Sequence, residues 1–221
     1  MLPLLHKNRR LQIGWEQRLG RDLPNRRDLW IQAASGGEAS LAVAILQKLD
    51  AAVTDIKALV TTNTAQGLEI LQKGLAGLTE IDVDVRFCPF DKPELMQRYM
   101  AAVNPRLIVL LETELWPGLL YAAQKQNVPV LLVNGRISPK SLKGYMRIKG
   151  FFRVLAPQTI MAITEDDAGR FKTLFTKSAV SVMPNIKFDR IQAETESVEN
   201  PALAQYLPNG APFAVLGSVR K

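Results

Sequence analysis

Residues 29–50, LWIQAASGGEASLAVAILQKLD, contain the pattern that decides the fold. The apolar run over 29–35 is typical of a buried strand, two glycines follow as a turn, and 38–50 has apolar residues at helical spacing. Similar strand-like and helix-like segments alternate along the rest of the chain. The strand-like segments are 56–62, 83–90, 106–112, 128–134, 159–164 and 179–184, and the helix-like ones are 64–75, 92–103, 113–126 and 165–175. This alternation predicts an α/β fold, a doubly wound, Rossmann-like parallel sheet.

The composition restricts the chemistry that the chain can perform. It has 221 residues, of which 47% are hydrophobic, so it can bury a core. Its one cysteine is Cys88, which excludes a disulfide framework and favours a reducing compartment. Its one histidine is His6, so no Ser-His-Asp or Cys-His arrangement is expected, nor most kinds of metal site. We therefore predict no metal and no cofactor, and we assign any acid–base chemistry to Asp, Glu, Lys or Tyr.

The net charge of +7 is concentrated in two places. Residues 1–28 have seven basic and three acidic residues, and residues 136–153 have six basic residues and no acidic one. Such patches favour an anionic partner: a membrane surface, phosphates or nucleic acid. Nucleic acid is disfavoured because the patches have few aromatic residues and no recognisable binding motif.

The second basic patch has helical periodicity. Arg136, Lys140, Lys143 and Arg147 follow one another at spacings of four, three and four residues, which predicts that they line one face of a helix. That face is either simply solvated or a surface that meets lipid phosphates. Trp15, in the first patch, is a core or interface residue or lies at a membrane surface.

Polar residues follow the predicted strands at the places where a parallel sheet binds ligands. In such sheets, ligands lie outside the carboxyl ends of the strands. The residues expected at this edge are Ser35 to Glu38, Thr61 to Thr64, Pro89 to Asp91, Glu112 to Glu114, Asn134 to Ser138, and Glu165.

The loop SGGE, residues 35–38, places a carboxylate where glycine loops usually bind an anion. It is neither a G-x-G-x-x-G dinucleotide fingerprint nor a P-loop. Glu38 is interpreted in two ways. It stabilises the start of the following helix as an acid in the first turn, or it accepts a proton in an open crevice.

The stretch LLETELWPG, residues 110–118, is more unusual. Thr113 is predicted to cap a helix that has Glu114 and Pro117 in its first turn. Glu112, at the last position of the strand, has no such explanation. If its strand neighbours the strand before Glu38, the two carboxylates would raise each other's pKa, toward that of a base active near neutral pH.

The ends of the chain are expected to differ from its centre. No stretch approaches the ~20 apolar residues of a spanning helix, and MLPLL could be the tail of a longer hydrophobic segment. Lys187, in PNIKFD, forms a structural salt bridge or contacts a phosphate or sugar. We predict a basic amphipathic membrane-proximal segment over 1–28, a Rossmann-like acceptor-binding domain over 29–189, a linker over 190–212, and the start of a truncated donor domain over 213–221.

Eight motifs occur in an order that resembles one known family. They are WEQRLG, WIQAASGGE, VTTNTAQG, FCPFD, ETELWP, NGRIS, GY and NIKFD. Together they are similar to the N-terminal half of the 3-deoxy-D-manno-octulosonic acid (Kdo) transferases, and the resemblance extends from about Trp15 to Asp189 and on to VLGS. These are inner-membrane enzymes that transfer Kdo from CMP-Kdo to a lipid A precursor.

The resemblance implies the acceptor half of an inverting GT-B glycosyltransferase in lipopolysaccharide biosynthesis, at the cytoplasmic face of the inner membrane. It implies that Glu38 is the general base, with Glu112 and Glu114 in the same cleft. Two departures from the family are the short MLPLL and the ending Gly217, Ser218, Val219, Arg220, where the family has glycine-serine-threonine-histidine. Since the family's C-terminal domain binds the nucleotide sugar and only its start is expected here, the chain alone is expected to be inactive. The alternatives are a non-catalytic lipid-docking or acceptor-binding module, or a GT-B glycosyltransferase with another donor.

These arguments assign the predicted site residues to three groups. Glu38 is catalytic, supported by Glu112 and Glu114. The residues predicted to bind the acceptor are Ser35, Gly36, Gly37, Thr62, Arg136 and Lys187. The residues predicted to contact the anionic membrane are Arg9, Arg10, Trp15, Lys140, Lys143 and Arg147.

Overall fold

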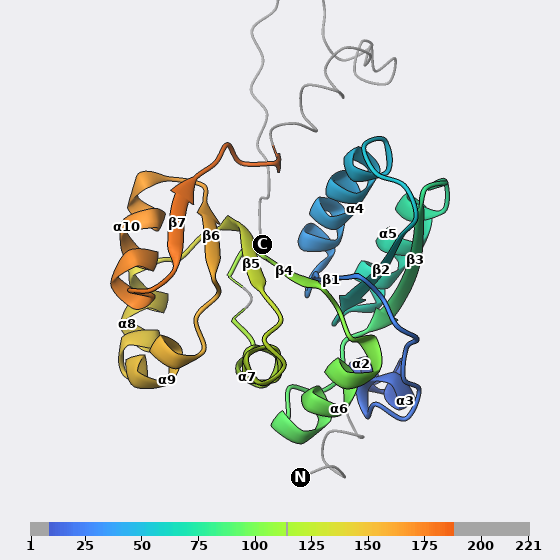
Figure 1. The fold of residues 1–221 in the computed structure, drawn as a ribbon, viewed down its shortest axis with the longest axis horizontal. Coiled ribbons are helices and arrows are strands. Elements are labelled where there is room, and N and C mark those ends of the chain that lie inside the picture. Colours follow the sequence, from blue (N-terminus) through green and yellow to red (C-terminus); the bar gives the residue numbers. More distant parts are fainter. Residues whose placement is uncertain (1–8, 114, 188–221) are drawn as a thin grey trace, which may run out of the picture. The chain divides into compact units, whose positions relative to one another are not determined.

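The computed structural model describes residues 9–113 and 115–187 (Figure 1). The chain forms two units, Met1–Asn185 and Ile186–Lys221, and the fold described below is that of the first. The predicted linker and donor segments, the MLPLL stretch and Glu114 lie outside the described residues. Lys187 belongs to the second unit, so the structure does not place it relative to the other candidate site residues.

A seven-stranded parallel sheet forms the centre of the first unit, in the order β3-β2-β1-β4-β5-β6-β7. From β1, strands β2 and β3 extend the sheet in one direction, and strands β4 to β7 extend it in the other. The predicted doubly wound sheet is therefore confirmed. The strands are β1 (Leu29–Gln32), β2 (Ile56–Thr62), β3 (Ile81–Phe87), β4 (Leu107–Leu111), β5 (Val130–Gly135), β6 (Thr159–Ala162) and β7 (Ala179–Val182).

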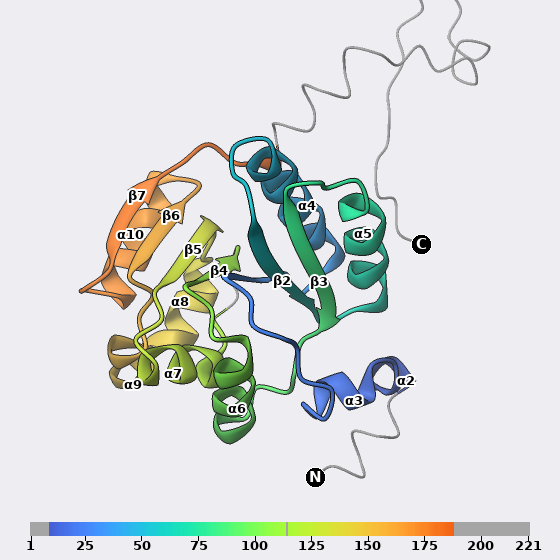
Figure 2. The same ribbon diagram turned by 45° about the vertical axis from the view of Figure 1, so that its right-hand side comes forward.

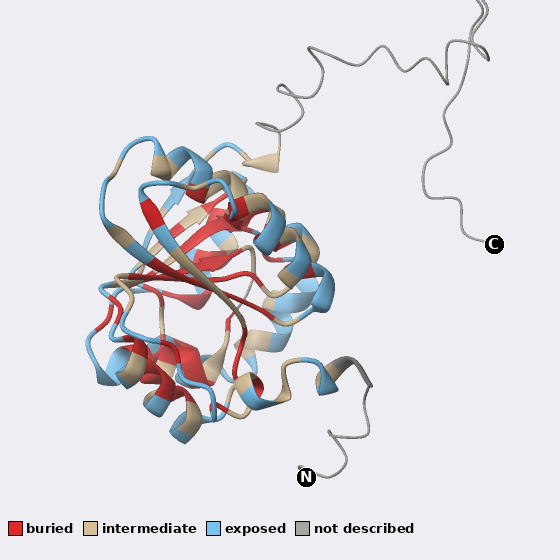
Figure 3. Cartoon of the chain, turned by 90° about the vertical axis from the view of Figure 1, so that its right-hand side faces the viewer, coloured by how far each residue is buried: buried red, intermediate tan, exposed pale blue. Residues whose placement is uncertain are grey.

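Helices connect consecutive strands and cover the sheet. Helix α4 packs beside α5, and α6 packs beside α7 (Figures 1 and 2). Figure 3 shows the central strands as mostly buried, together with parts of the helices that cover them. The helices are α2 (Arg9–Gln12), α3 (Trp15–Arg18), α4 (Gly36–Asp50), α5 (Ala65–Leu75), α6 (Pro93–Val103), α7 (Pro117–Lys125), α8 (Pro139–Met146), α9 (Lys149–Val154) and α10 (Glu165–Leu174).

Four helices begin at a serine or threonine that caps them. In each, the side-chain oxygen accepts a hydrogen bond from the N–H three residues later, which satisfies one of the free donors at the helix start. The pairs are Ser35 with Glu38, Thr64 with Gly67, Ser138 with Ser141, and Thr164 with Asp167. Each of these caps lies two or three residues beyond a strand end, so it fixes where that loop turns into a helix.

The largest core cluster lies between the sheet and helices α6, α7, α9 and α10. Trp30 is fully buried in it and packs against Tyr99, with ring centroids 5.2 Å apart. Among the described residues, no helix has both the length and the apolar character needed to cross a bilayer.

Two sequence predictions about helices are wrong. Thr113 does not cap α7, because the helix begins only at Pro117 and its N-cap is Trp116. Arg136 does not share a helix face with Lys140 and Lys143, because Ser138 and Pro139 start α8 after it. Proline is common at the first position of a helix, because the N–H that it lacks would have no partner within the helix there. Pro139 occupies this position in α8.

Candidate active site

The two candidate carboxylates follow neighbouring strands. β1 lies between β2 and β4, and Gln32 of β1 is opposite Leu110 of β4. The chain reverses its direction across the sheet at this pair, and this switch point is where open α/β sheets bind ligands. The start of α4, which contains Glu38, and the segment that contains Glu112 both follow the strands there. The condition that the sequence left open, that the two strands are neighbours, is thus met.

Glu38 closes a capping box at the start of α4. Its Oε2 accepts a hydrogen bond from the Ala34 N–H at 2.6 Å, and its Oε1 accepts one from the Ser35 hydroxyl at 2.9 Å. Ser35 Oγ in turn accepts the Glu38 N–H at 3.4 Å. The interpretation of Glu38 as a residue that stabilises the helix start is confirmed, in the reciprocal form known for S-x-x-E sequences.

The Glu38 side chain is not openly exposed. The residue is 6% exposed, so the prediction of a carboxylate in an open crevice is wrong in this respect. A carboxylate oxygen has two lone pairs, and each oxygen of Glu38 uses one of them in the hydrogen bonds described above.

Burial raises the pKa of Glu38 above its ordinary value. The hydrogen bonds from Ser35 and Ala34 lower this pKa in part, and the negative charge of Glu112 raises it again. Burial and a like charge both favour the neutral acid. The predicted influence of Glu112 on the Glu38 pKa is present, and it acts together with a larger effect of burial that the sequence did not show.

Glu112 has an unusual backbone conformation. Its φ is +57°, and Asn134, at the end of the neighbouring strand β5, also has a φ of +57°. The left-handed region costs non-glycine residues about 1 kcal/mol or more, so the surrounding structure must impose it. One restraint is the hydrogen bond from the Glu112 N–H to the Val133 carbonyl at 3.0 Å. A residue in the left-handed region thus lies at or near the ends of two adjacent strands, β4 and β5.

The two glycines of the loop have different surroundings. A Cβ on Gly36 would lie 3.2 Å from the side chain of Gln66, so this position is restricted by contact with α5. A Cβ on Gly37 would meet only Ser35 Oγ, at 3.9 Å, and Gly37 is exposed with no positive φ. Neither packing nor backbone geometry requires glycine at position 37.

Thr62 does not fit its predicted role as an acceptor ligand. It is fully buried, and a Cβ added to Gly67 of α5 would lie only 2.3 Å from Thr62 Oγ1. The Thr62 side chain thus packs beneath the start of α5. With no surface to offer to a ligand, it is assigned a structural role, and the prediction for this residue is corrected.

Asp91 is a residue whose role the sequence did not reveal. Its two carboxylate oxygens accept hydrogen bonds from the N–H groups of Gly118 and Leu119, at 2.9 and 2.8 Å. Asp91 therefore caps α7 from the loop after β3, in place of a local cap, and burial raises its pKa. The carboxylate joins the FCPFD and ETELWPG motifs and fixes the segment that follows Glu112.

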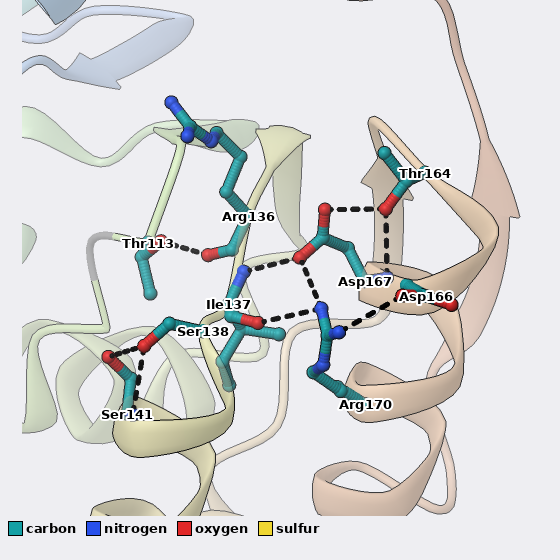
Figure 4. Close-up of polar contacts among 9 residues, drawn as sticks. All are labelled: Thr113, Arg136, Ile137, Ser138, Ser141, Thr164, Asp166, Asp167 and Arg170. Atoms are coloured by element: carbon teal, nitrogen blue, oxygen red, sulfur yellow. Dashed lines mark hydrogen bonds and ion pairs between the residues drawn. The ribbon is translucent and has the colours of Figure 1, made fainter.

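Arg136 lies on a backbone that is held from both sides (Figure 4). Its carbonyl accepts a hydrogen bond from the Thr113 hydroxyl, and the next N–H, of Ile137, donates to Asp167 at 2.9 Å. Arg170 also binds the Ile137 carbonyl, at 3.2 Å. The guanidinium of Arg136 extends away from the other labelled side chains and is exposed. The structure thus presents a cation beside the Glu112–Thr113 segment on a fixed support.

The other predicted residues lie apart from the switch point or are only partly described. Lys140, Lys143 and Arg147 are exposed on α8 and at its end. Trp15 is half-buried, with its ring edge-on to Phe90 at 5.6 Å. Arg9 and Arg10 begin α2, but their side chains are outside the description. Among residues 9–113 and 115–187, no group of His, Cys, Asp and Glu side chains could hold a metal ion.

Arg18 is a buried arginine that the sequence did not single out. It is 2% exposed and stacks over Phe87 at 4.4 Å, and its Nη2 donates to the Asn63 carbonyl at 2.8 Å. Burial lowers its pKa. Arg18 joins α3 to the loop after β2, and its place in the fold is structural.

Comparison with known proteins identifies the family. The family model described as 3-deoxy-D-manno-octulosonic-acid transferase (kdotransferase) matches residues 13–190. This chain belongs to that family. It is 33% identical to the 3-deoxy-D-manno-octulosonic acid transferase of Rickettsia conorii over 83% of its own length, and 28% identical to the one of Haemophilus influenzae over 75%. It spans 39% of the length of each of these transferases.

Other similarities are more distant. A bifunctional glycosyltransferase/methyltransferase of Fusobacterium nucleatum is 26% identical over 92% of this chain and 32% of its own length. Among solved structures, the UDP-GlcNAc 2-epimerase of Neisseria meningitidis bound to UDP-GlcNAc superimposes with a TM-score of 0.54 at 17% identity, covering 81% of this chain and 52% of the epimerase. At that identity the likeness concerns the fold alone, and it agrees with the predicted fold class.

We expect Asp91→Ala to destabilise the Kdo transferase fold by about 1–3 kcal/mol, because two N–H groups at the start of α7 lose their acceptor. Urea unfolding of the 221-residue chain measures this. The matched control is Glu80→Ala, which removes an exposed acid and should change the free energy of unfolding by less than about 0.5 kcal/mol. Equal stability of the two variants would show that Asp91 does not hold α7.

Proposed function

We propose that this chain is the acceptor half of a Kdo transferase, which transfers Kdo from CMP-Kdo to a lipid A precursor in lipopolysaccharide biosynthesis. Membership of the Kdo transferase family supports the reaction class. The observation that supports the place of the chemistry is the pairing of Glu38 and Glu112 at the switch point of the sheet. The donor domain would follow in a longer polypeptide, and the chain alone would be inactive.

In the proposed mechanism, Glu38 removes the proton from an acceptor hydroxyl. That oxygen attacks the anomeric carbon of Kdo and forms the new C–O bond, while the bond between this carbon and the CMP phosphate oxygen breaks. CMP leaves with the electron pair on the opposite face, so the configuration inverts. The raised pKa of Glu38 suits this role, because a base with a pKa nearer the working pH transfers protons more effectively.

The surrounding residues have supporting roles in this proposal. Glu112 raises the pKa of Glu38, and we assign Glu114 to the same cleft by the family resemblance. Ser35 orients the carboxylate through its hydroxyl, and the exposed Gly37 lets the acceptor approach. Arg136 binds an acceptor phosphate on its fixed backbone, and Lys187 a phosphate or sugar. No metal or cofactor is required by these steps.

The proposed location is the cytoplasmic face of the inner membrane, where the lipid acceptor is found. The support for it is the charge distribution: residues 136–153 have no acid, and Lys140, Lys143 and Arg147 are exposed. Arg9, Arg10 and Trp15 would contact the same membrane from the N-terminal segment.

We expect Glu38→Gln to lower kcat about 100- to 10,000-fold, since an amide cannot accept the proton. The assay uses CMP-Kdo and a lipid A precursor with a polypeptide that contains these 221 residues followed by a donor domain. Glu80→Gln is the matched control, because it makes the same change at an exposed acid that precedes β3 and so lies away from the carboxyl edge of the sheet. Full activity of Glu38→Gln would favour the alternative of a non-catalytic lipid-docking module, in which Glu38 only caps α4.

We expect Gly37→Ala to leave the free energy of unfolding unchanged or higher, because alanine favours a helical first turn and its Cβ has room. The same methyl group should reduce kcat/KM about tenfold or more by obstructing the acceptor. Unchanged kcat/KM would show that the acceptor does not approach the backbone at this loop. Replacing CMP-Kdo by other nucleotide sugars tests the remaining alternative, a GT-B glycosyltransferase with another donor.

A further inference from the structure

A cluster of exposed apolar side chains lies at helix α9. Among the described residues, six large hydrophobic side chains are exposed, and three of them fall within seven residues: Ile148, Phe151 and Val154, at 55%, 44% and 61% exposure. We name these three residues the apolar ridge. Scattered exposed hydrophobic residues are ordinary on protein surfaces, whereas a concentration in one short segment is a feature that interaction surfaces share.

The ridge is presented on a firmly packed helix. Phe152, between the exposed residues, is 2% exposed, and its ring is edge-on to Tyr145 at 5.1 Å and to Phe175 at 6.1 Å. The carbonyl of Val154 accepts a hydrogen bond from Gln124 Nε2 at 3.0 Å, which ties the end of α9 to α7. The orientation of the ridge is therefore set by the core, and little conformational entropy would be lost on binding.

In the sequence, basic residues precede the apolar ridge and alternate with it. Residues 136–153 have six basic residues and no acidic one, and each of the six is exposed. In the part of the chain that the structure describes, none of these six side chains forms an ion pair. The basic residues are Arg136, Lys140, Lys143, Arg147, Lys149 and Arg153.

This combination selects one kind of partner. An apolar protein surface placed over the ridge would also cover neighbouring cations, and burying charges without acids to pair with them is costly. An anionic bilayer offers a separate place to each group, with phosphates at the surface for the cations and acyl chains beneath for the apolar side chains. We infer that the apolar ridge inserts into the interface of an anionic lipid bilayer while the surrounding cations bind lipid phosphates.

The inference rests on the proposed function for the choice of a membrane, and it adds how the chain binds there. Arg136 lies at the end of β5, where the Thr113 hydroxyl bonds its carbonyl, and the cationic segment continues from there through α8 to α9. Insertion of α9 would hold the carboxyl edge of β5 at a fixed position relative to the lipid surface.

A dye at position 151 tests insertion directly. Cys88 is the only cysteine and is 3% exposed, so a Phe151→Cys variant accepts an environment-sensitive nitrobenzoxadiazole label at the chosen position. The matched control is Val182→Cys, which replaces an exposed apolar residue of β7, and unsubstituted chain measures labelling of Cys88. We expect a severalfold rise in emission at position 151 with phosphatidylethanolamine–phosphatidylglycerol vesicles, and no rise at position 182.

Vesicle binding of unlabelled variants separates insertion from attraction by charge. The Phe151→Ser, Val154→Ser double variant should bind these vesicles at least about tenfold more weakly than the unsubstituted chain. The Val182→Ser variant should bind as the unsubstituted chain does. Lys143→Ala with Arg147→Ala should weaken binding about 10- to 30-fold, and added salt should weaken all binding. Far-ultraviolet circular dichroism and urea unfolding verify that each variant is folded.

Three results would overturn the inference. They are equal dye responses at positions 151 and 182, unchanged binding of the double serine variant, and equal binding to zwitterionic phosphatidylcholine vesicles. A response of the dye to nucleic acid in place of vesicles would also overturn it. The dye and vesicle measurements use neither donor nor acceptor. A failure of the insertion inference is therefore distinguishable from a failure of the proposed function, which the transfer assay tests by itself.

Discussion

The hydrogen bonds of the Glu38 carboxylate to Ala34 and Ser35 are the interaction on which the candidate site depends. They end strand β1, start helix α4 and hold an ionisable group at the switch point of the sheet. Glu112 is brought to the same place by the pairing of β1 with β4. One side chain thus has a structural role and a proposed chemical one. Only a substitution that keeps the shape of the side chain but cannot accept a proton, such as Glu38→Gln, separates the capping role from the proposed role as a base.

The sheet could be predicted from the sequence because its signals are local. Apolar runs bounded by glycine and proline marked the strands, and helical spacing marked α4, α5 and α10. The start of α7 could not be predicted, because its cap is Asp91, from a distant loop. Arg136 was placed on a helix face because its spacing fits, while the cap at Ser138 starts the helix later. The S-x-x-E pattern at 35–38 contained the capping box, but the burial of Glu38 and of Thr62 depends on neighbouring elements that a single sequence does not show.

Burial has a consequence for stability as well as for catalysis. The folded chain binds the proton of Glu38 more tightly than the unfolded chain does, because the folded pKa is raised. The contribution of this group is therefore complete below the ordinary glutamate pKa. It is lost as the pH rises through the raised folded pKa. A fold that retains such a group sacrifices some stability at neutral pH, which is the pattern expected where a carboxylate serves as a base.

The most direct test of this account is a titration of Glu38 in the 221-residue chain by carbon-13 NMR of its carboxyl group. We predict a pKa above the ordinary glutamate value of 4.5, and a lower pKa in the Glu112→Gln variant because one of its causes is removed. A Glu38 that titrates at or below 4.5, and does not respond to Glu112→Gln, would contradict the proposal that this carboxylate is a base tuned by its surroundings.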